Sequence, residues 1–225
     1  MNKVQSNIPV VTIDGPGGSG KGTLGLLVAK ELGWHFLDSG ALYRILALAA
    51  LNQHIDLTNE KKLAALAYNL ETQFGAEIFL EGKCVTQAIR SEQCGNIASK
   101  IAVYPAVRNA LLERQRAFLT PPGLVADGRD MGTVVFPKAQ LKIFLVASQE
   151  ERAMRRFLQL KDVVKNVTLQ SLLEEIAERD ARDKARVVAP LIPAKEAVVI
   201  DTTGIGIETV LNLVMSEIKQ RFLKF

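Results

Sequence analysis

Residues 8–23 read IPVVTIDGPGGSGKGT, and this stretch decides the fold. The apolar run that ends at Asp14 indicates a buried strand, and the spacing of apolar residues over 24–32 indicates a helix. Between them, glycines let the backbone turn tightly and direct N–H groups at phosphate oxygens, while Lys21 can reach the β and γ phosphates. The stretch therefore predicts a phosphate-binding loop. A glycine-rich turn without a ligand is the simpler alternative, and the lysine argues against it.

The position after the lysine departs from the general pattern of such loops. Gly22 stands where a serine or threonine usually binds magnesium, and Thr23 comes one place later. We therefore assign no direct protein ligand to the metal, and expect Mg²⁺ to be held through water.

Length and composition restrict the class of protein. The chain has 225 residues, of which 48% are apolar and 23% charged, which is enough for one sizeable core with inserted elements. No apolar run approaches the roughly 20 residues that span a bilayer, and the first strand begins too early to leave room for a signal peptide. We expect a cytoplasmic protein with no membrane partner.

Charge and cysteine content bear on two further classes. The net charge of +4 could suggest nucleic acid, but the basic residues are dispersed and interleaved with acids, and a small anionic substrate explains them equally well. We expect no nucleic-acid partner. Cys84 and Cys94 have no metal-ligand spacing with the histidines, so we expect two reduced thiols.

Apolar runs and helical periodicity alternate along the chain. Five apolar strands are predicted at 8–14, 34–37, 123–127, 141–146 and 197–201, and those at 123–127 and 141–146 are expected to be buried. Helices are predicted at 21–32, 40–52 and 148–160, in a segment ending near 186, and in a closing segment at 207–222. This order predicts an α/β fold with a five-stranded parallel sheet flanked by helices. Short strand-like pieces at 71–74, 77–80 and 83–85, separated by glycines, predict a small antiparallel insert.

We expect these parts to form one structural unit over residues 1–225. Its ranges are a core at 1–59, 100–150 and 190–225, an insert at about 60–99 and a lid at about 151–189. No dimerisation stripe is visible, so we expect a monomer.

Two polar stretches follow predicted strands, at the sheet edge where parallel α/β proteins bind ligands. The first stretch is residues 38–44, in which Arg44 lies one helical turn inside the next helix. Arg44 could bind an acceptor phosphate, and a solvated helix arginine is the alternative. In residues 127–130, Asp127 could order Mg²⁺ or its waters and Arg129 could meet phosphate, with a local Asp–Arg turn as the alternative.

A third polar stretch ends a predicted helix. Helical spacing brings Arg179, Arg182, Asp183 and Arg186 onto one broad face, and Arg155 and Arg156 precede them on a separate helix. Two such helices could close as a basic lid and exclude water. A salt-bridged, solvated helix is the alternative, since acids and bases nearly balance there. Residues 96–99 and 104–108 show only a helix break at Pro105.

Four stretches together resemble the bacterial cytidylate kinase family: residues 15–23, 38–44, 126–137 and 178–183. The similarity covers almost the whole chain. The Gly-Lys-Gly-Thr ending is shared by nucleoside-monophosphate kinases generally, so Gly22 is normal there. The Asp-Gly-Arg-Asp-Met-Gly stretch and the Arg-Asp-x-x-Asp helix are specific to the cytidylate branch.

The resemblance implies a P-loop NTPase-like core and transfer of the γ-phosphoryl group of ATP to CMP or dCMP, with Mg²⁺ required. It implies that the insert is the monophosphate-binding region. The ATP-binding residues would be Gly15, Pro16, Gly17, Gly18, Ser19, Gly20, Lys21, Gly22 and Thr23. The catalytic residues would be Lys21, Asp127, Arg129, Arg155 and Arg182.

The resemblance also implies how the acceptor is bound. Ser99, Arg108 and Asp130 would face the cytosine. The acceptor phosphate would be held by Arg44, Arg129 and Arg186, and Arg179 and Asp183 would approach the sugar, with Ser39 also in the binding set. Two other classes stay open: a different small-molecule kinase, such as one for shikimate, and a nucleotide-dependent binding or switch protein.

Overall fold

The computed structural model describes residues 8–162 and 166–222. The outer ends of the predicted core and part of the predicted lid fall on residues 1–7, 163–165 and 223–225, which lie outside the described residues. The chain divides into two compact units, which are described separately below. Unit 1 comprises residues 1–37 and 118–225, and unit 2 comprises residues 38–117.

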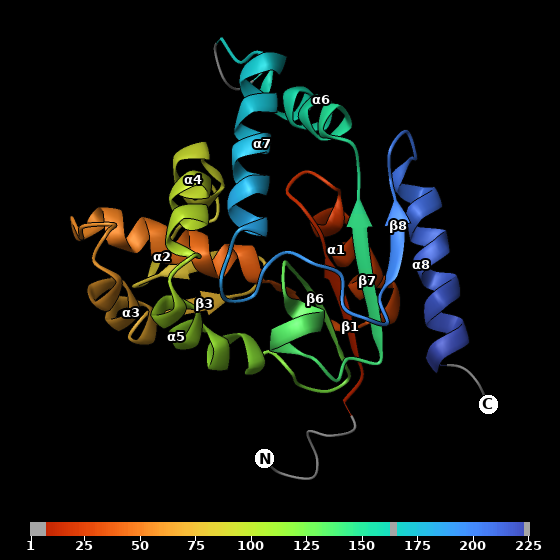
Figure 1. The fold of residues 1–225 in the computed structure, drawn as a ribbon. Coiled ribbons are helices and arrows are strands. Elements are labelled where there is room, and N and C mark those ends of the chain that lie inside the picture. The colour runs from red at the N-terminus through yellow and green to blue at the C-terminus, as the bar shows by residue number, and fades with distance from the viewer. Residues whose placement is uncertain (1–7, 163–165, 223–225) are drawn as a thin grey trace. The chain divides into compact units, whose positions relative to one another are not determined.

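Unit 1 contains the main sheet, in the order β2-β6-β1-β7-β8. Figure 1 shows β6, β1, β7 and β8 of this sheet. The strand bounds are β1 Val10–Asp14, β2 His35–Asp38, β6 Leu124–Gly128, β7 Leu141–Val146 and β8 Val198–Asp201. The β1–β6, β1–β7 and β7–β8 pairs are parallel, so the predicted five-stranded parallel sheet is confirmed. The three central strands are almost wholly buried, which explains why they read as continuous apolar runs.

Two helices form an apolar cluster with this sheet. They are α1 (Lys21–Leu32), which contributes Leu24 and Val28, and α8 (Ile207–Phe222), which contributes Val214 and Ile218. A Cβ on Gly25 would lie 2.7 Å from the Phe36 ring, so the glycine permits a close approach of α1 to the end of β2. This packing fixes the start of α1 directly behind the glycine-rich loop.

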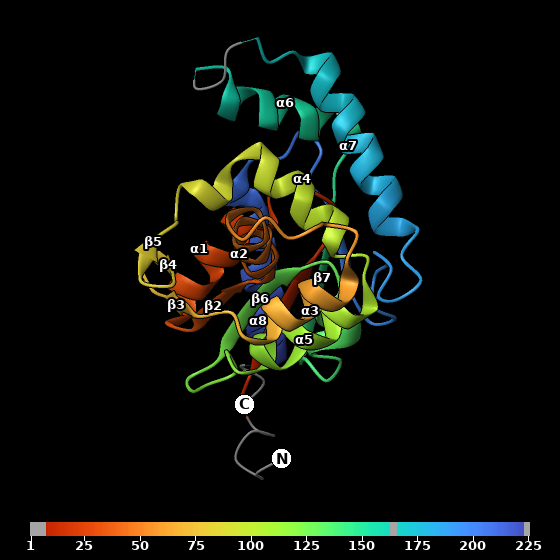
Figure 2. The ribbon, with the colours of Figure 1, turned by 90° about the vertical axis from the view of Figure 1, so that its left-hand side faces the viewer.

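Unit 1 also contains the predicted lid helices, α6 (Gln149–Leu160) and α7 (Leu169–Lys184), which pack side by side (Figures 1 and 2). The prediction that Arg186 shares a helical face with Arg179 is wrong, because α7 ends at Lys184. The backbone N–H of Leu191 donates to the Asp183 carbonyl at 3.0 Å, which folds the chain back over the helix end.

Unit 2 is mainly helical and carries the small sheet. Its helices are α2 Ser39–Asn52, α3 Glu60–Tyr68, α4 Glu92–Ile101 and α5 Pro105–Arg116, with a 3₁₀ turn at Ala88–Arg90. Strands β3 Thr72–Phe74, β4 Ile78–Leu80 and β5 Lys83–Cys84 pair antiparallel, which confirms the predicted insert sheet. Helices α3, α4 and α5 were not predicted, although Pro105 does begin a helix after a break.

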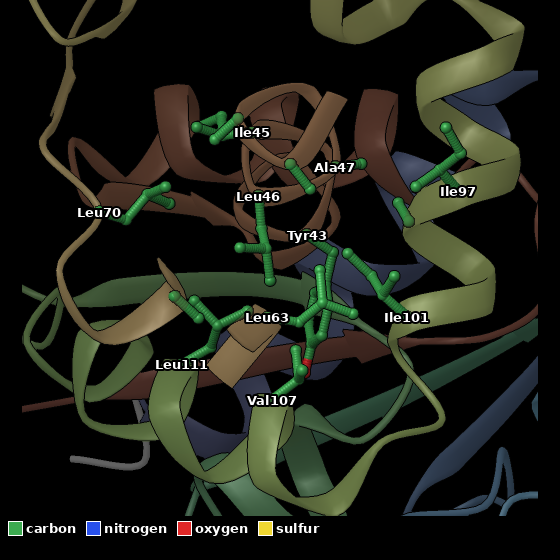
Figure 3. Close-up of a cluster of buried hydrophobic side chains, with 14 of the residues drawn as sticks. Tyr43, Ile45, Leu46, Ala47, Leu63, Leu70, Ile97, Ile101, Val107 and Leu111 are labelled. Atoms are coloured by element: carbon green, nitrogen blue, oxygen red, sulfur yellow. The ribbon is translucent and has the colours of Figure 1, made fainter. Parts of the chain in front are cut away.

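The interior of unit 2 is an apolar cluster that joins α2 to its helical neighbours (Figure 3). Leu46 of α2, Leu63 of α3 and Leu111 of α5 are fully buried there. Figure 2 shows α3 beside α5, in agreement with their extensive contact. No helix among the described residues is both long and apolar enough to cross a membrane.

Candidate active site

The glycine-rich loop joins β1 to α1 and has an unusual backbone. Gly18 and Gly20 have φ values of 80° and 89°, in the left-handed region that favours glycine. A Cβ on Gly15 would lie only 2.3 Å from the Leu145 carbonyl oxygen of β7. The loop can therefore pass this close to the sheet edge only because glycines stand at these positions.

Hydrogen bonds hold the loop through its carbonyl oxygens. The Pro16 carbonyl accepts from Ser19 Oγ at 3.0 Å and from Lys21 Nζ at 2.8 Å. Thr202 Oγ1 donates to the Ser19 carbonyl oxygen at 3.3 Å. Helix α1 begins without a side-chain cap and without an acidic residue in its first turn. Backbone N–H groups at a helix start of this kind form a ready site for phosphate.

Lys21 is buried among charges of both signs. Burial lowers the pKa of its ammonium group to about 7, and the nearby Arg129 lowers it further, while Asp127 acts in the opposite direction. An anion bound beside Lys21 would offset both the burial and the repulsion. The loop therefore presents a cationic site that suits phosphate.

Two carboxylates follow the central strands. The register aligns Ile13 with Asp127 and Asp14 with Gly128, so both acids lie at the carboxyl edge of the sheet. Asp14 accepts hydrogen bonds from the backbone N–H groups of Met131 and Gly132, each at 2.8 Å. Burial nevertheless raises the pKa of Asp14 to about 6. Asp14 thus holds the start of a short π-helical turn, Met131–Val135, directly after Asp130.

The lack of a side chain at Gly22 has a structural reason. A Cβ at this position would lie 3.2 Å from Asp127 Oδ2, so the glycine lets that carboxylate approach the first turn of α1. The described residues contain no cluster of three or more His, Cys, Asp or Glu side chains able to hold a metal. Mg²⁺ in nucleotide kinases usually keeps several waters and needs only one or two carboxylates beside the phosphates. Asp127 next to a phosphate loop fits that type of site.

The predicted Arg129, Asp183 and Arg186 come together. Arg129 Nε donates to Asp183 Oδ2 at 2.9 Å, and Arg186 donates to the other carboxylate oxygen. Burial acts to raise the pKa of Asp183, but the two guanidinium groups and Arg179 hold it below its usual value. Burial likewise acts to lower the pKa of Arg129, and Asp183 outweighs it, so the net shift is upward. Asp183 and Arg129 therefore both stay ionised near neutral pH.

Two arginines of this group approach the loop. A Cβ on Gly17 would lie 3.5 Å from Arg129 Nη2 and 3.7 Å from Arg179 Cδ. Arg182, in contrast, pairs with Glu178 along α7 at 3.4 Å, as the salt-bridged alternative expects. Each of these three arginines is one that the sequence singled out.

Arg155 of α6 is held by several hydrogen bonds. Its guanidinium donates to the Thr202 hydroxyl at 3.0 Å, to the Thr202 carbonyl and to Glu151. A Cβ on Gly20 would lie 3.9 Å from Arg155 Nη1, so this arginine also borders the loop.

Sequence reasoning missed four buried polar residues of this site: Asp14, Arg152, Asp180 and Thr202. Arg152 makes a two-point ion pair with Asp180, with distances of 3.0 and 2.6 Å. In the sequence, Arg152 is one of several arginines on a helix rich in charge, and no spacing separates it from its neighbours. Asp14 ends an apolar strand next to the loop, which is a signal that could have been used.

The remaining predicted residues lie in unit 2. Arg44 of α2 donates to the carbonyls of Ile89 and Ser91 at 3.0 and 3.3 Å, so it is not a solvated helix arginine. Arg108 of α5 donates to the Ala102 carbonyl at 3.1 Å and lies over the Tyr43 ring, 5.8 Å from its centroid. The other two, Ser39 and Ser99, are buried.

Comparisons with known proteins agree with this geometry. The chain is 60% identical over 223 residues to the cytidylate kinase of Stutzerimonas stutzeri (strain A1501), covering 96% of this chain and 97% of that protein. It is 61% identical over 220 residues to the cytidylate kinase of Pseudomonas fluorescens (strain SBW25), covering 95% and 96%. A crystal structure of an uncharacterized protein from Eubacterium ventriosum ATCC 27560 shares the fold, with a TM-score of 0.50 and 11% identity over 95% of this chain and 99% of that one. The family model "Cytidylate kinase" matches residues 11–220, and the chain therefore belongs to the cytidylate kinase family.

Proposed function

We propose that this protein transfers the γ-phosphoryl group of ATP to CMP or dCMP, forming ADP and CDP or dCDP in pyrimidine nucleotide metabolism. The observation that carries the proposal is the phosphate loop with Lys21 at the start of α1, beside the Arg129–Asp183 pair, in a chain of this family. The oxygen of the acceptor phosphate attacks the γ-phosphorus as the bond to the β,γ-bridging oxygen breaks. No covalent intermediate with the enzyme is needed.

On the donor side, residues 15–23 bind ATP. Backbone N–H groups of the loop and Lys21 hold the β and γ phosphates, and Arg129, Arg155 and Arg182 neutralise charge on the transferring group. In the structure Arg155 and Arg182 have other partners, so both roles require these side chains to exchange a protein partner for phosphate. Asp127 orders Mg²⁺ through water, and the ion, when bound, supplies charge neutralisation at the phosphates.

On the acceptor side, three groups of residues have distinct roles. Cytosine is recognised by Ser99, Arg108 and Asp130, which offer acceptors to its amino group and donors to O2 and N3. The acceptor phosphate is held by Arg44, Arg129 and Arg186, with Ser39 nearby in the binding set. Arg179 and Asp183 bind the sugar. The proposal also includes cytoplasmic location and a monomeric state, with no nucleic-acid or membrane partner.

Product analysis tests this function against the two alternatives. The protein is incubated with ATP, Mg²⁺ and a panel of acceptors that includes CMP, dCMP, UMP, AMP and shikimate. We expect CDP and dCDP with stoichiometric ADP. Shikimate phosphate would show a different small-molecule kinase, and ATP binding without any phosphorylated acceptor would show a switch or binding protein.

A further inference from the structure

Arg152 joins three segments of unit 1 through one buried guanidinium group. Only 3% of its side chain is exposed. It donates to the carbonyl of Ala147, just beyond β7, and to the carbonyl of Gly17 in the phosphate loop, both at 3.1 Å. Its two terminal nitrogens also bind the two oxygens of Asp180 on α7. The same residue therefore contacts the end of the sheet, the loop and the lid.

Only arginine can make this set of contacts. The guanidinium fork binds a carboxylate at two points and still presents other N–H donors, whereas the ammonium of lysine is a single point charge. The loop also packs directly on this residue, since a Cβ on Gly18 would lie 3.0 Å from Arg152 Cβ. Burying such a charge is costly unless it is paired, and Asp180 supplies the pair.

Because the peptide bond is planar, the bond from Arg152 to the Gly17 carbonyl also affects a backbone N–H group that can bind phosphate. In a trans peptide the C=O and the following N–H point in opposite directions. A bond that holds the Gly17 carbonyl therefore also fixes the direction of the Gly18 N–H. The bonds to the Pro16 and Ser19 carbonyls orient the N–H groups of Gly17 and Gly20 in the same way. Of these three carbonyls, that of Gly17 is held by a charged side chain from the lid.

We propose that Arg152, held in place by Asp180, is a positioning residue that orients the phosphate loop for the donor nucleotide and couples the loop to α7. The kinetic part of this inference rests on the proposed function. Helix α7 also carries Arg179 and Asp183, so the guanidinium of Arg152 ties the loop to the helix that presents these charges. A change at Arg152 acts on phosphate geometry through the loop, without contact to substrate.

Three purified variants test the inference: Arg152→Lys, Asp180→Asn and the control Arg116→Lys. Arg116 belongs to an exposed i,i+3 pair with Glu113 in unit 2, so it reports the effect of an ordinary Arg-to-Lys change. For each, kcat, KM for CMP, thermal midpoint and binding of a fluorescent ATP analogue without CMP are measured. Misplacement of a reacting group by about 1 Å can cost roughly 100-fold in rate.

For Arg152→Lys we expect kcat to fall by about 10- to 100-fold and analogue binding to weaken by about tenfold, with KM for CMP changed by less than about threefold. Asp180→Asn keeps the hydrogen bond from Arg152 to the Gly17 carbonyl, so kcat and analogue binding should fall in the same pattern but less, by about three- to tenfold. Arg116→Lys should match the wild type.

The inference would be overturned if folded Arg152→Lys had the kcat and the analogue affinity of the wild type. It would also be overturned if kcat and analogue binding fell only in proportion to the fraction of protein that is folded. If Arg152→Lys does not fold, Asp180→Asn decides by the same criteria. The analogue titration needs no acceptor, so a wild-type protein that makes no CDP would refute the proposed function while leaving this test intact.

Discussion

Both units contain an apolar cluster, but they differ in how much charge they bury. Unit 1 buries ionisable groups at the carboxyl edge of its sheet, among them Asp14, Lys21, Asp127 and Asp183. The cluster of unit 2 is made of aliphatic side chains and one tyrosine (Figure 3). Buried charges cost desolvation free energy but form a preorganised electrostatic site, whereas apolar packing stabilises the fold. Substitutions in the charged interior should therefore change catalysis, and those in the apolar interior should change stability.

The largest effect should come from Lys21→Ala. Because the proposed function places its ammonium group on the transferring phosphates, we expect kcat to fall on the order of 1,000-fold. CMP binding should weaken far less, because the lysine belongs to the donor site. Steady-state kinetics and calorimetric titration with CMP measure the two quantities. A near-normal kcat would show that the buried cation of unit 1 has no catalytic role.

Leu63→Ala probes the apolar interior of unit 2. Leu63 is fully buried, so the lost contacts and the cavity should lower the free energy of unfolding by about 2–5 kcal/mol. Denaturant titration measures this loss, and kcat per folded molecule should stay within about twofold of the wild type. A large fall in kcat without a loss of stability would break the contrast between the two interiors.

The charged interior should also respond to pH. The pKa of Lys21 is lowered to about 7, so the free enzyme loses this charge as pH rises through 7. At saturating CMP and with ATP as its Mg²⁺ complex, kcat/KM for ATP should fall up to about tenfold per pH unit above 7. The kcat value should hold to higher pH, because bound phosphate stabilises the protonated lysine. A flat kcat/KM profile from pH 6 to 9 would contradict the lowered pKa.

The smallest effect should be a gain in stability from Lys21→Met. The folded-state pKa is below the unfolded value, so the charged lysine destabilises the fold and wild-type stability rises between pH 7 and 10.5. At pH 7 the variant should unfold about 2–4 °C higher, a gain of about 1 kcal/mol in unfolding free energy. This advantage should shrink as pH increases. Thermal scans at three pH values measure it, and an advantage that grows with pH would have the wrong sign.

The same contrast explains what the sequence could predict. The strands of unit 1 could be predicted because buried parallel strands read as apolar runs in the sequence. The site at the sheet edge could be predicted because Asp127 and Arg129 stand where such a strand ends. In unit 2 the prediction found α2 but missed α3, α4 and α5. Helices α4 and α5 mix polar and apolar residues, and their stability comes from packing with α2 and α3.

The sequence pattern could not predict which partners the individual site residues bind. Arg152 and Arg155 lie on one helix, yet the first binds Asp180 and the loop while the second binds Thr202. For Arg152, Asp180 and Gly17 lie 28 and 135 positions away in the chain, and for Arg155, Thr202 lies 47 positions away, so only tertiary packing brings them together. Sequence motifs therefore singled out candidate site residues, and the network of charges among them required the structure.

The central claim is that this phosphate site serves a cytidine monophosphate acceptor. It is tested most directly by kcat/KM for CMP and UMP, measured with the same enzyme, ATP and Mg²⁺. Cytosine offers an amino donor that uracil lacks, and a site with buried acceptors for that group rejects the analogue strongly. We predict a preference for CMP of at least about 100-fold. Equal kcat/KM values for CMP and UMP would contradict the account.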